Sequence, residues 1–447
     1  MSSARRCFRR RRRRFFALIT LAIAASGAPA ARAQFDQFAQ PGGATFGSEP
    51  RQIGSQDRFD EALRNSRWRL GKLYVDPWIG FRDIGYVGRV DLADGGQLDS
   101  GLTATAGAGI DTYLPLGQNV TWASHASPLY VWFQEEEDRN RLNLDASTGL
   151  YGRLGRVGLE LDARRSERLR MFSQEVPQQV NMRRDQGQLR LSIPVVGGFT
   201  LFGNASTSRI ESLEDPELLA VPFQALDRDE LVFDAGIGYR FRRGILVQLG
   251  VGHSEVELAE GSLPLDNEGN ALILRLSHGT EWIGFDADLA YRELDPRGAQ
   301  SQFLPFRGVA GRTGLQWKLS RWAAPEVYFR RNLVYSLAEQ AAYFVDTRYG
   351  LGIRSRPVER LQLRAFVENG SNDYHASRAS AASPREDDVF TYGGTVATRI
   401  GWLNAGVTAY RSDFDSNVPG FDRDVTVVQS HVSLSVGLRL GGDLIWD

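Results

Sequence analysis

Cysteine, lysine and long apolar runs are almost absent from this chain of 447 residues. Its single cysteine is Cys7, close to the N-terminus, so neither a disulfide framework nor a thiolate metal site is expected. No stretch beyond residue 33 holds 18 consecutive apolar residues, which excludes a transmembrane helix. Lys72 and Lys318 are the only lysines, so arginine supplies nearly all of the positive charge.

The N-terminus has the pattern of a signal peptide over residues 1–33. Arg9 to Arg14 form a basic region, Phe15 to Ala25 an apolar region, and Ala31-Arg32-Ala33 a cleavage site of small residues. The segment carries nine arginines and no acid, so 53 minus 9 leaves 44 basic residues against 54 acidic ones. The exported chain therefore has a net charge of 44 − 54 = −10, which argues against nucleic acid as a partner.

Apolar and polar residues alternate along much of the chain with a period of two. Between Leu102 and Leu114 the even-numbered residues are mostly apolar, and the odd-numbered ones include Thr103, Asp111 and Tyr113. An alternating stretch of this length exceeds an ordinary globular strand and suits a strand with one face in lipid and the other in water.

The same unit recurs to the end of the chain, and its connections alternate in length. Short turns near Leu116-Gly117, Leu154-Gly155 and Gly197-Gly198 are separated by longer polar loops, and this order continues to Ile400-Gly401. Such alternation is typical of outer-membrane barrels, which have short periplasmic turns and longer extracellular loops. We therefore predict an all-β fold, a transmembrane up-and-down antiparallel β-barrel of about 18 strands.

The predicted organisation has three parts. The signal peptide covers 1–33, a polar periplasmic N-terminal segment covers 34–70, and the barrel covers 71–447. Within the second part, residues 56–67 are predicted to form a short helix with Phe59, Ala62 and Leu63 on one side. This segment either leads into the first strand or plugs the lumen or docks a partner.

The polar faces of the predicted strands supply candidate lumen-lining residues. They are rich in arginine and also carry acids, namely Arg164, Arg168, Arg240, Arg242, Arg312, Arg348, Arg354, Arg364, Asp162, Asp286 and Glu368. Arginine side chains can hydrogen-bond the carboxylates or hydroxyls of a passing solute. The alternative is a wall stiffened by arginine–carboxylate pairs.

Aromatic residues are also expected to point into the lumen, where ring faces stack on sugars. The strand pattern places there Tyr74, Tyr113, Tyr130, Trp132, Phe202, Tyr328, Phe366 and Tyr410. The five histidines lie far apart, and no nucleophile motif accompanies them. We therefore predict no enzyme activity, no cofactor and no metal site.

Two segments carry a family resemblance. LGKLYVDPWIGFRDIGYVGRV, from Leu70, and AGAGIDTYLPLGQNVTW, from Ala106, resemble the first strands of the outer-membrane proteins grouped as beta-barrel porin 2. Many members of that group accompany exopolysaccharide or capsule export systems. In the first segment Leu73, Val75, Pro77, Ile79, Gly85, Tyr86 and Val90 match the group's pattern, whereas Val87-Gly88-Arg89 replaces its Asp-x-Asn element.

The resemblance implies that the chain is the outer-membrane conduit of an exopolysaccharide or capsule export system. Its expected partners are outer-membrane lipid and lipopolysaccharide, a polysaccharide or oligosaccharide, and periplasmic export components. Two other functions remain open at this point. One is a general or oligosaccharide diffusion porin, and the other is a non-conducting outer-membrane scaffold.

Overall fold

The computed structural model describes Phe59, Leu63, Ser66 and residues 68–435. Within 68–435 it leaves out 88–89, 92–96, 99–101, 135, 172–174, 176–178, 215–222, 242–243, 260–263, 321, 338–340, 378–384 and 401–402. The predicted signal peptide, most of segment 34–70 and residues 436–447 lie outside the described residues. Among the residues described, no helix is long and apolar enough to span a membrane.

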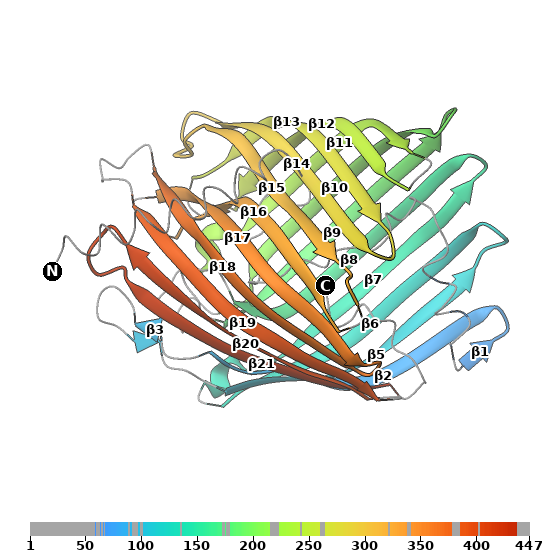
Figure 1. Cartoon of the computed structure of the whole chain (residues 1–447), viewed down its shortest axis with the longest axis horizontal. Coiled ribbons are helices and arrows are strands. Elements are labelled where there is room, and N and C mark those ends of the chain that lie inside the picture. Colours follow the sequence, from blue (N-terminus) through green and yellow to red (C-terminus); the bar gives the residue numbers. More distant parts are fainter. Residues whose placement is uncertain are drawn as a thin grey trace.

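Eighteen antiparallel strands form one closed barrel (Figure 1). Their bounds are β2 (Leu73–Val87), β5 (Leu102–Pro115), β6 (Val120–Phe133), β7 (Arg141–Leu154), β8 (Val157–Met171), β9 (Gln179–Pro194), β10 (Phe199–Ser212), β11 (Arg228–Arg240), β12 (Leu246–Leu258), β13 (Asn267–Gly279), β14 (Ile283–Pro296), β15 (Phe306–Trp317), β16 (Ala324–Tyr335), β17 (Ala341–Val358), β18 (Leu361–Ala376), β19 (Glu386–Ile400), β20 (Leu403–Ser416) and β21 (Arg423–Ser435).

The first and last of these strands pair with each other and close the barrel. β2 and β21 pair from Trp78 opposite Ser435 to Val87 opposite Val427. Each other strand pairs with its neighbours in sequence, β2 pairing next with β5. The predicted fold class and strand number are thereby confirmed.

Short elements accompany the barrel. β1 (Trp68–Leu70) pairs with β2, and β3 (Val90–Asp91) pairs with β4 (Gln97–Leu98) in a small separate hairpin. The 3-10 helices η2 (Glu137–Arg139) and η3 (Phe223–Leu226) lie in two of the longer loops. Phe59 and Leu63 are helical, and the ring of Phe59 contacts Tyr113 and Tyr151 at centroid distances of 5.8 and 5.2 Å.

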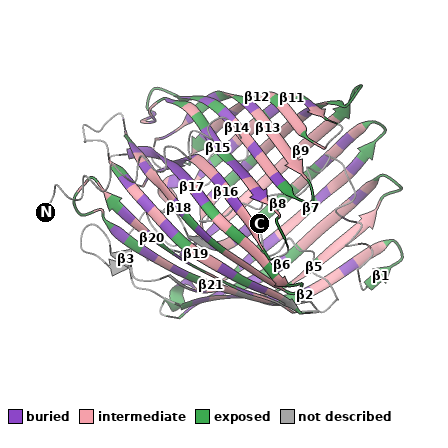
Figure 2. Ribbon diagram, viewed as in Figure 1, coloured by how far each residue is buried: buried purple, intermediate pink, exposed green. Residues whose placement is uncertain are grey.

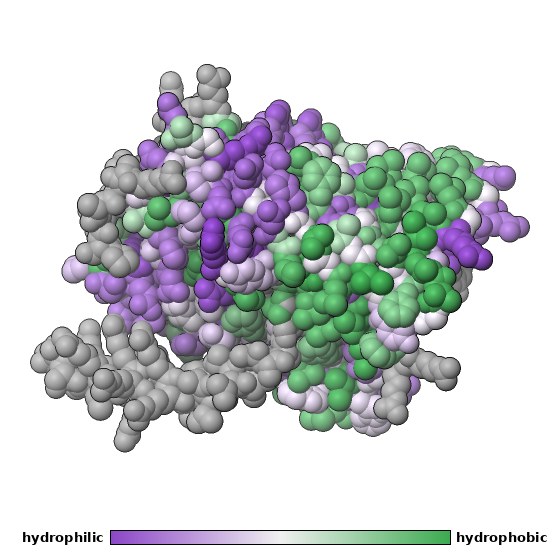
Figure 3. Space-filling view, turned by 90° about the horizontal axis from the view of Figure 1, so that it is seen from above, coloured by the Kyte–Doolittle hydropathy of each residue, from purple (hydrophilic) through white to green (hydrophobic). Residues whose placement is uncertain are grey.

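The outer surface carries an apolar belt over one half of the barrel. Figure 3 shows apolar residues gathered over the half that ends in short turns, whereas the half that ends in the longer loops is hydrophilic. A rung across the belt consists of Ile237, Leu249, Leu274 and Leu289, which stand opposite one another in β11 to β14. Leu249 is 55% exposed, as expected of a side chain that faces lipid.

Two aromatic predictions are wrong. Tyr130 and Trp132 are 47% and 38% exposed and point outward rather than into the lumen. The register of β6 explains this, because Asp111 of β5 stands opposite His125 and hydrogen-bonds it on the inner face. Odd-numbered residues of β6 therefore point inward, and even-numbered ones face outward.

A charge on the apolar belt should destabilise the barrel far more than the same charge one residue away. We expect Leu249→Arg to lower the free energy of unfolding by about 2–4 kcal/mol, because the guanidinium would lie near the middle of the belt. Gln248→Arg is the control, since Gln248 belongs to the inner face of β12. Urea titration of both variants in lipid vesicles measures the difference, and equal effects would contradict the assignment of the two faces.

Candidate functional site

One inner wall of the barrel is built from arginine–carboxylate clusters on β7, β8 and β9. Asp145 of β7 accepts a hydrogen bond from Nε of Arg168 at 2.8 Å, and Nε of Arg164 lies 3.5 Å from the same carboxylate. On the neighbouring strands Arg190 pairs with Glu160 at 3.1 Å and lies 4.0 Å from Asp162. These side chains share one face because they stand at alternate positions of adjacent strands.

A second cluster centres on Glu326 of β16, which is 1% exposed. Nε of Arg354 lies 2.8 Å from its Oε2, and Nε of Arg364 donates to its Oε1 at 2.7 Å. The two arginines come from β17 and β18, so one carboxylate joins three strands. The Arg364 guanidinium also lies over the rings of Tyr328 and Phe366, at 5.9 and 5.5 Å from their centres.

Further along the same wall the pairing continues toward the longer loops. Asp346 contacts Arg348 at 2.8 Å and Arg330 at 3.2 Å, and Arg348 also donates to the backbone oxygen of Ser371. Glu368 accepts a hydrogen bond from the hydroxyl of Tyr328 at 2.9 Å. Charge-assisted bonds of this kind hold the side chains in fixed positions along the wall.

The predicted lumen residues thus fall into two groups on opposite walls. Asp162, Arg164 and Arg168 belong to β8, whereas Asp286, Arg312, Arg348, Arg354, Arg364 and Glu368 belong to β14–β18. Arg240 ends β11 at a short turn, and Arg242 lies outside the described residues. That these residues contact a solute stays a prediction.

Removing Glu326 should leave two guanidinium groups without their carboxylate in a poorly hydrated place. We expect Glu326→Ala to lower the free energy of unfolding by about 3 kcal/mol. Glu326→Gln keeps a hydrogen-bond acceptor and should lower it by less. Urea unfolding of the two variants tests this, and an Ala variant as stable as the wild type would contradict the structural role of the cluster.

The mouth at the end with the longer loops departs from a simple cylinder because the sheet splits between β15 and β16. These strands pair only from Gly311 opposite Arg331 to Gln316 opposite Glu326. Beyond that point β15 stays paired with β14, whereas β16 stays paired with β17 as far as Tyr335 opposite Tyr343. The end of the β16–β17 hairpin has therefore left the wall.

Burial shows where the hairpin end goes. Leu351 and Ile353 of β17 are 40% and 47% exposed, yet Tyr343 and Val345 on the same face of that strand are 1% and 2% exposed (Figure 2). The buried end packs in one apolar cluster with residues of β9, β10, β12, β14 and β15 and of the neighbouring loops. Its members are Val180, Met182, Ile210, Leu226, Val256, Leu265, Leu294, Phe303, Phe306, Leu333, Tyr335, Ala342, Tyr343 and Val345. The same strand face meets lipid at one end and the barrel interior at the other.

Polar contacts fix the same hairpin end to the far strands. Nδ2 of Asn267 donates to the hydroxyl of Tyr335 at 2.6 Å, and the Arg228 guanidinium lies 5.3 Å from the centre of the Tyr335 ring. Asn267 begins β13 and Arg228 begins β11, so Tyr335 reaches strands that its own strand never pairs with.

A second split lies between β7 and β8. Their pairing stops at Asp145 opposite Ser166, although β8 and β9 remain paired to Met171 opposite Gln179. Leu169 of β8 packs on Val131 and Phe133, which belong to the inner face of β6. The β8–β9 hairpin end therefore also lies inside the barrel. β8 and β16 are eight strands apart around eighteen, so the two inward-turned ends approach from nearly opposite sides.

Glu175 joins the two ends across the mouth. It lies in the loop between β8 and β9, and it accepts hydrogen bonds from the Ser336 hydroxyl at 2.8 Å and from the Leu337 N–H at 3.0 Å. Ser336 and Leu337 directly follow β16. Burial raises the pKa of Glu175 above its usual value of 4.5, although the two hydrogen bonds and the charges of Arg385 and Arg423 oppose the rise.

The raised pKa sets the sign of a pH effect. Because the folded protein holds the Glu175 proton more tightly than the unfolded chain does, Glu175 favours folding below pH 4.5, and this contribution is lost as pH rises through the raised pKa. Glu175→Gln has no charge to bury, so we expect it to be more stable than the wild type near neutral pH and equal to it in acid. Denaturant titrations across this pH range measure both, and a variant without advantage at neutral pH would contradict the prediction.

The alternating pattern of the sequence does not predict that the ends of these two hairpins turn into the barrel. A signal for one of them exists, because NLVYSLAEQAAYFV, from Asn332, breaks the alternation with apolar residues on both faces. No comparable pattern marks Glu175, whose contacts join residues 161 and 162 positions apart in the chain.

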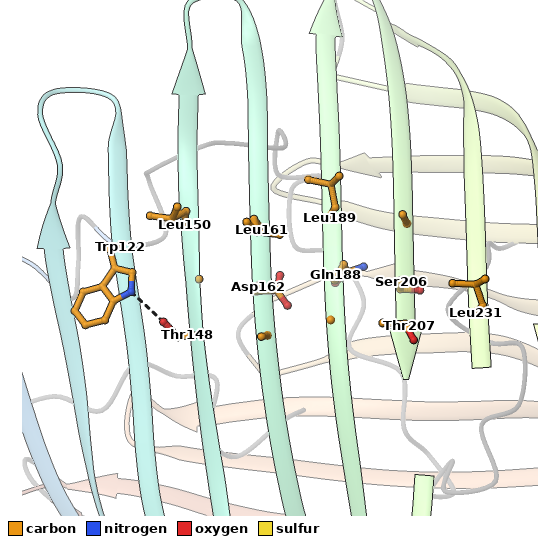
Figure 4. A pocket seen from close by; sticks show the side chains of 14 residues that line it. Trp122, Thr148, Leu150, Leu161, Asp162, Gln188, Leu189, Ser206, Thr207 and Leu231 are labelled. Atoms are coloured by element: carbon orange, nitrogen blue, oxygen red, sulfur yellow. Dashed lines mark hydrogen bonds between the residues drawn. The ribbon is translucent and has the colours of Figure 1, made fainter. Parts of the chain in front are cut away.

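A groove of about 630 Å³ crosses the strands β6–β11 (Figure 4). Leu161, Leu189 and Leu231 line it, and Nε1 of Trp122 donates to the Thr148 hydroxyl at 2.9 Å beside it. Asp162 and Gln188 also border the groove, but its leucines are on the face opposite to Arg190 of the inner wall, and Leu161 is 48% exposed, so the groove belongs to the lipid-facing surface. It is not on the path of a solute that crosses the lumen.

Comparisons with known proteins bear on the fold. No model of a known protein family and no characterised protein sequence matches the chain. Among solved structures, OccAB3 of Acinetobacter baumannii is similar with a TM-score of 0.50 and 8% identity, over 81% of this chain and 98% of that one. A BenF-like porin from Pseudomonas fluorescens Pf-5 has a TM-score of 0.49 and 12% identity, over 81% of this chain and 99% of that one. OccK2 (OpdF) of Pseudomonas aeruginosa, solved with glucuronate, has a TM-score of 0.46 and 14% identity, over 81% of this chain and 96% of that one.

At these identities the likeness to OccAB3 speaks for the fold alone. The location follows from the molecule itself. Its backbone hydrogen bonds close in a ring, and its outward side chains form an apolar belt, which together are the features of a barrel that spans an outer membrane.

Proposed function

We propose that the chain is an outer-membrane diffusion channel for small hydrophilic solutes, with a preference for anions. The main support is the polar inner wall of an otherwise apolar-coated barrel. Within β14–β18 the described inward-facing charges include six arginines and five acids, namely Arg292, Arg312, Arg330, Arg348, Arg354, Arg364, Asp286, Asp288, Glu326, Asp346 and Glu368. The excess of arginine favours solutes that carry carboxylates.

Small solutes fit the mouth better than a polymer does. The apolar cluster between β9 and β17 fills the interior beside half of the strands, which narrows the passage at the extracellular end. The polysaccharide export function implied by the family resemblance gains no support, since no family model matches the chain. A non-conducting scaffold would not need an arginine-rich inner wall, although it would share the same outer surface.

The role of the lumen arginines is testable with two residues of one strand. Arg312 and Arg307 both belong to β15, but Arg312 is on the inner face and Arg307, 61% exposed at its side chain, is on the outer face. We expect the wild type to pass anions better than cations, and we expect Arg312→Glu to reduce that preference while Arg307→Glu leaves it unchanged. Reversal potentials in planar bilayers under a salt gradient measure the selectivity.

Three outcomes would count against the proposal. A wild type that never conducts would favour the scaffold. A wild type that prefers cations would contradict the role of the arginine excess. Equal effects of Arg312→Glu and Arg307→Glu would show that the inner face does not set the selectivity.

A further inference from the structure

The groove across β6–β11 is hollow because small side chains form its floor (Figure 4). The floor residues stand opposite one another on four neighbouring strands, and they are Thr148, Ala163, Gly187 and Thr207. Trp122 and Leu231 border its two ends. Its volume of about 630 Å³ lies within the range of small-molecule binding sites.

The two long edges of the groove differ in chemistry. Toward the short turns the edge consists of leucines, which are Leu150, Leu161 and Leu189. Toward the longer loops, each of the strands β8–β11 carries a charged residue two positions beyond the groove, and these are Arg165, Asp185, Arg209 and Asp229. Residues two positions apart on a strand share one face, so all four point outward. The step from leucine to charge marks the boundary between hydrocarbon and water.

The charged edge is paired but keeps donors to spare. Nε and Nη2 of Arg165 donate to the two oxygens of Asp185, both at 2.7 Å. The same two atoms of Arg209 donate to Asp229, both at 2.8 Å. These bonds use two of the five N–H groups of each guanidinium. The side chains of the two arginines are 46% and 58% exposed, so a ligand can reach them from outside.

The chemistry of the two edges defines the occupant. The groove faces the hydrocarbon of the membrane, so the acyl chain of a lipid fills it. Every membrane lipid offers such a chain, and therefore the head group decides which lipid the site holds. A phosphate can accept the remaining N–H groups of either arginine, while an ammonium group can donate to either aspartate. Neighbouring strands are about 4.8 Å apart, so a phosphate and an ammonium group joined by two carbons reach both partners.

A head group with several negative charges fits this edge less well. The next charged row toward the loops has Glu167, Arg183 and Glu211 on the same outer face of β8–β10. The described charges of the two rows are therefore four acids and three arginines. Several phosphates placed there would meet carboxylates as well as guanidinium groups, and like charges repel.

We propose that this groove, with its charged edge, binds one phospholipid that has a zwitterionic phosphoethanolamine head group. One acyl chain lies on the floor between Trp122 and Leu231. The phosphate meets Arg165 or Arg209, and the ammonium group meets the neighbouring aspartate. The site is on the outer surface of the barrel, so it does not depend on whether the lumen conducts.

Native mass spectrometry of the detergent-purified chain measures which lipid is retained. The probes are dioleoyl phosphatidylethanolamine, dioleoyl phosphatidylglycerol and lipid A. We expect one phosphatidylethanolamine per chain, held about fivefold more tightly than phosphatidylglycerol, because both lipids offer a phosphate but only the first offers an ammonium group.

A matched pair of variants tests the groove. Gly187→Leu fills the floor, and the added Cβ meets only Cγ2 of Thr207, at an ordinary contact distance of 3.5 Å, so the barrel accommodates it. Gly203→Leu makes the same change on the outer face of β10 outside the groove, where a Cβ meets only the backbone oxygen of Asp234 at 4.0 Å. We expect Gly187→Leu to lose the retained lipid and Gly203→Leu to keep it.

A second comparison tests the charged edge. The double variant Arg165→Gln, Arg209→Gln should bring the fivefold preference close to unity. Arg411→Gln is the control, because Arg411 is also 44% exposed and paired with acids on the outer face, but it belongs to β20, far around the barrel. It should leave the preference unchanged.

Trp122 reports on the same site in a membrane. In vesicles of equal parts phosphatidylethanolamine and phosphatidylglycerol, bromine on the acyl chains of one lipid quenches the tryptophans that contact it. The difference between the wild type and Trp122→Phe isolates the signal of Trp122 from the other tryptophans. We expect stronger quenching of Trp122 when phosphatidylethanolamine carries the bromine, and we expect Gly187→Leu to remove this difference.

Three results would overturn the proposal. Phosphatidylglycerol or lipid A held more tightly than phosphatidylethanolamine would overturn the zwitterionic head group. Equal retention by Gly187→Leu and Gly203→Leu, with equal quenching of Trp122 by the two brominated lipids, would overturn the groove as a site. An unchanged preference in the double arginine variant would overturn the role of the charged edge.

Discussion

Closure of the backbone hydrogen-bond ladder is the constraint on which the rest of this structure depends. In lipid an unpaired N–H or C=O group is too unfavourable to persist, so a sheet can span the membrane only when its first and last strands pair. Here β2 and β21 make that pairing, although the partners Ile84 and Ser430 are 346 positions apart in the chain. The inner and outer faces, and therefore the polar wall and the apolar belt, follow from closing this ring.

The same constraint explains where the ladder is allowed to break. Both splits, between β7 and β8 and between β15 and β16, occur at the ends of the strands that lead into the longer loops. There water, side chains and loops can take the place of ladder partners, as when the Leu144 N–H donates to the carboxylate of Glu167. The mouth is thus free to be shaped by side-chain packing in a way that the membrane-spanning part is not.

Much of this architecture was predictable from sequence, because alternation is a local property. The faces of β5, the order of short turns and long loops, and the number of strands all follow from residues close together in the chain. The phase of β6 was not predictable in this way, since Tyr130 and Trp132 look like inner-face aromatics until the pairing of Asp111 with His125 is known. The pairs of Glu326 with Arg354 and Arg364, and of Glu175 with Ser336, depend on which strands meet, and no local pattern encodes that.

The inner wall combines two roles in one set of residues. Glu326, Asp346 and Asp145 each bind two arginines and so fix them in the wall, while Arg312 remains exposed toward the interior. The most direct test of the central claim, a polar channel that the hairpin ends narrow at its mouth, is the single-channel conductance of the wild-type protein in planar bilayers. The account predicts a measurable conductance well below that of an unobstructed eighteen-strand barrel. A membrane that stays insulating, or a conductance as large as that of the open barrel, would contradict it.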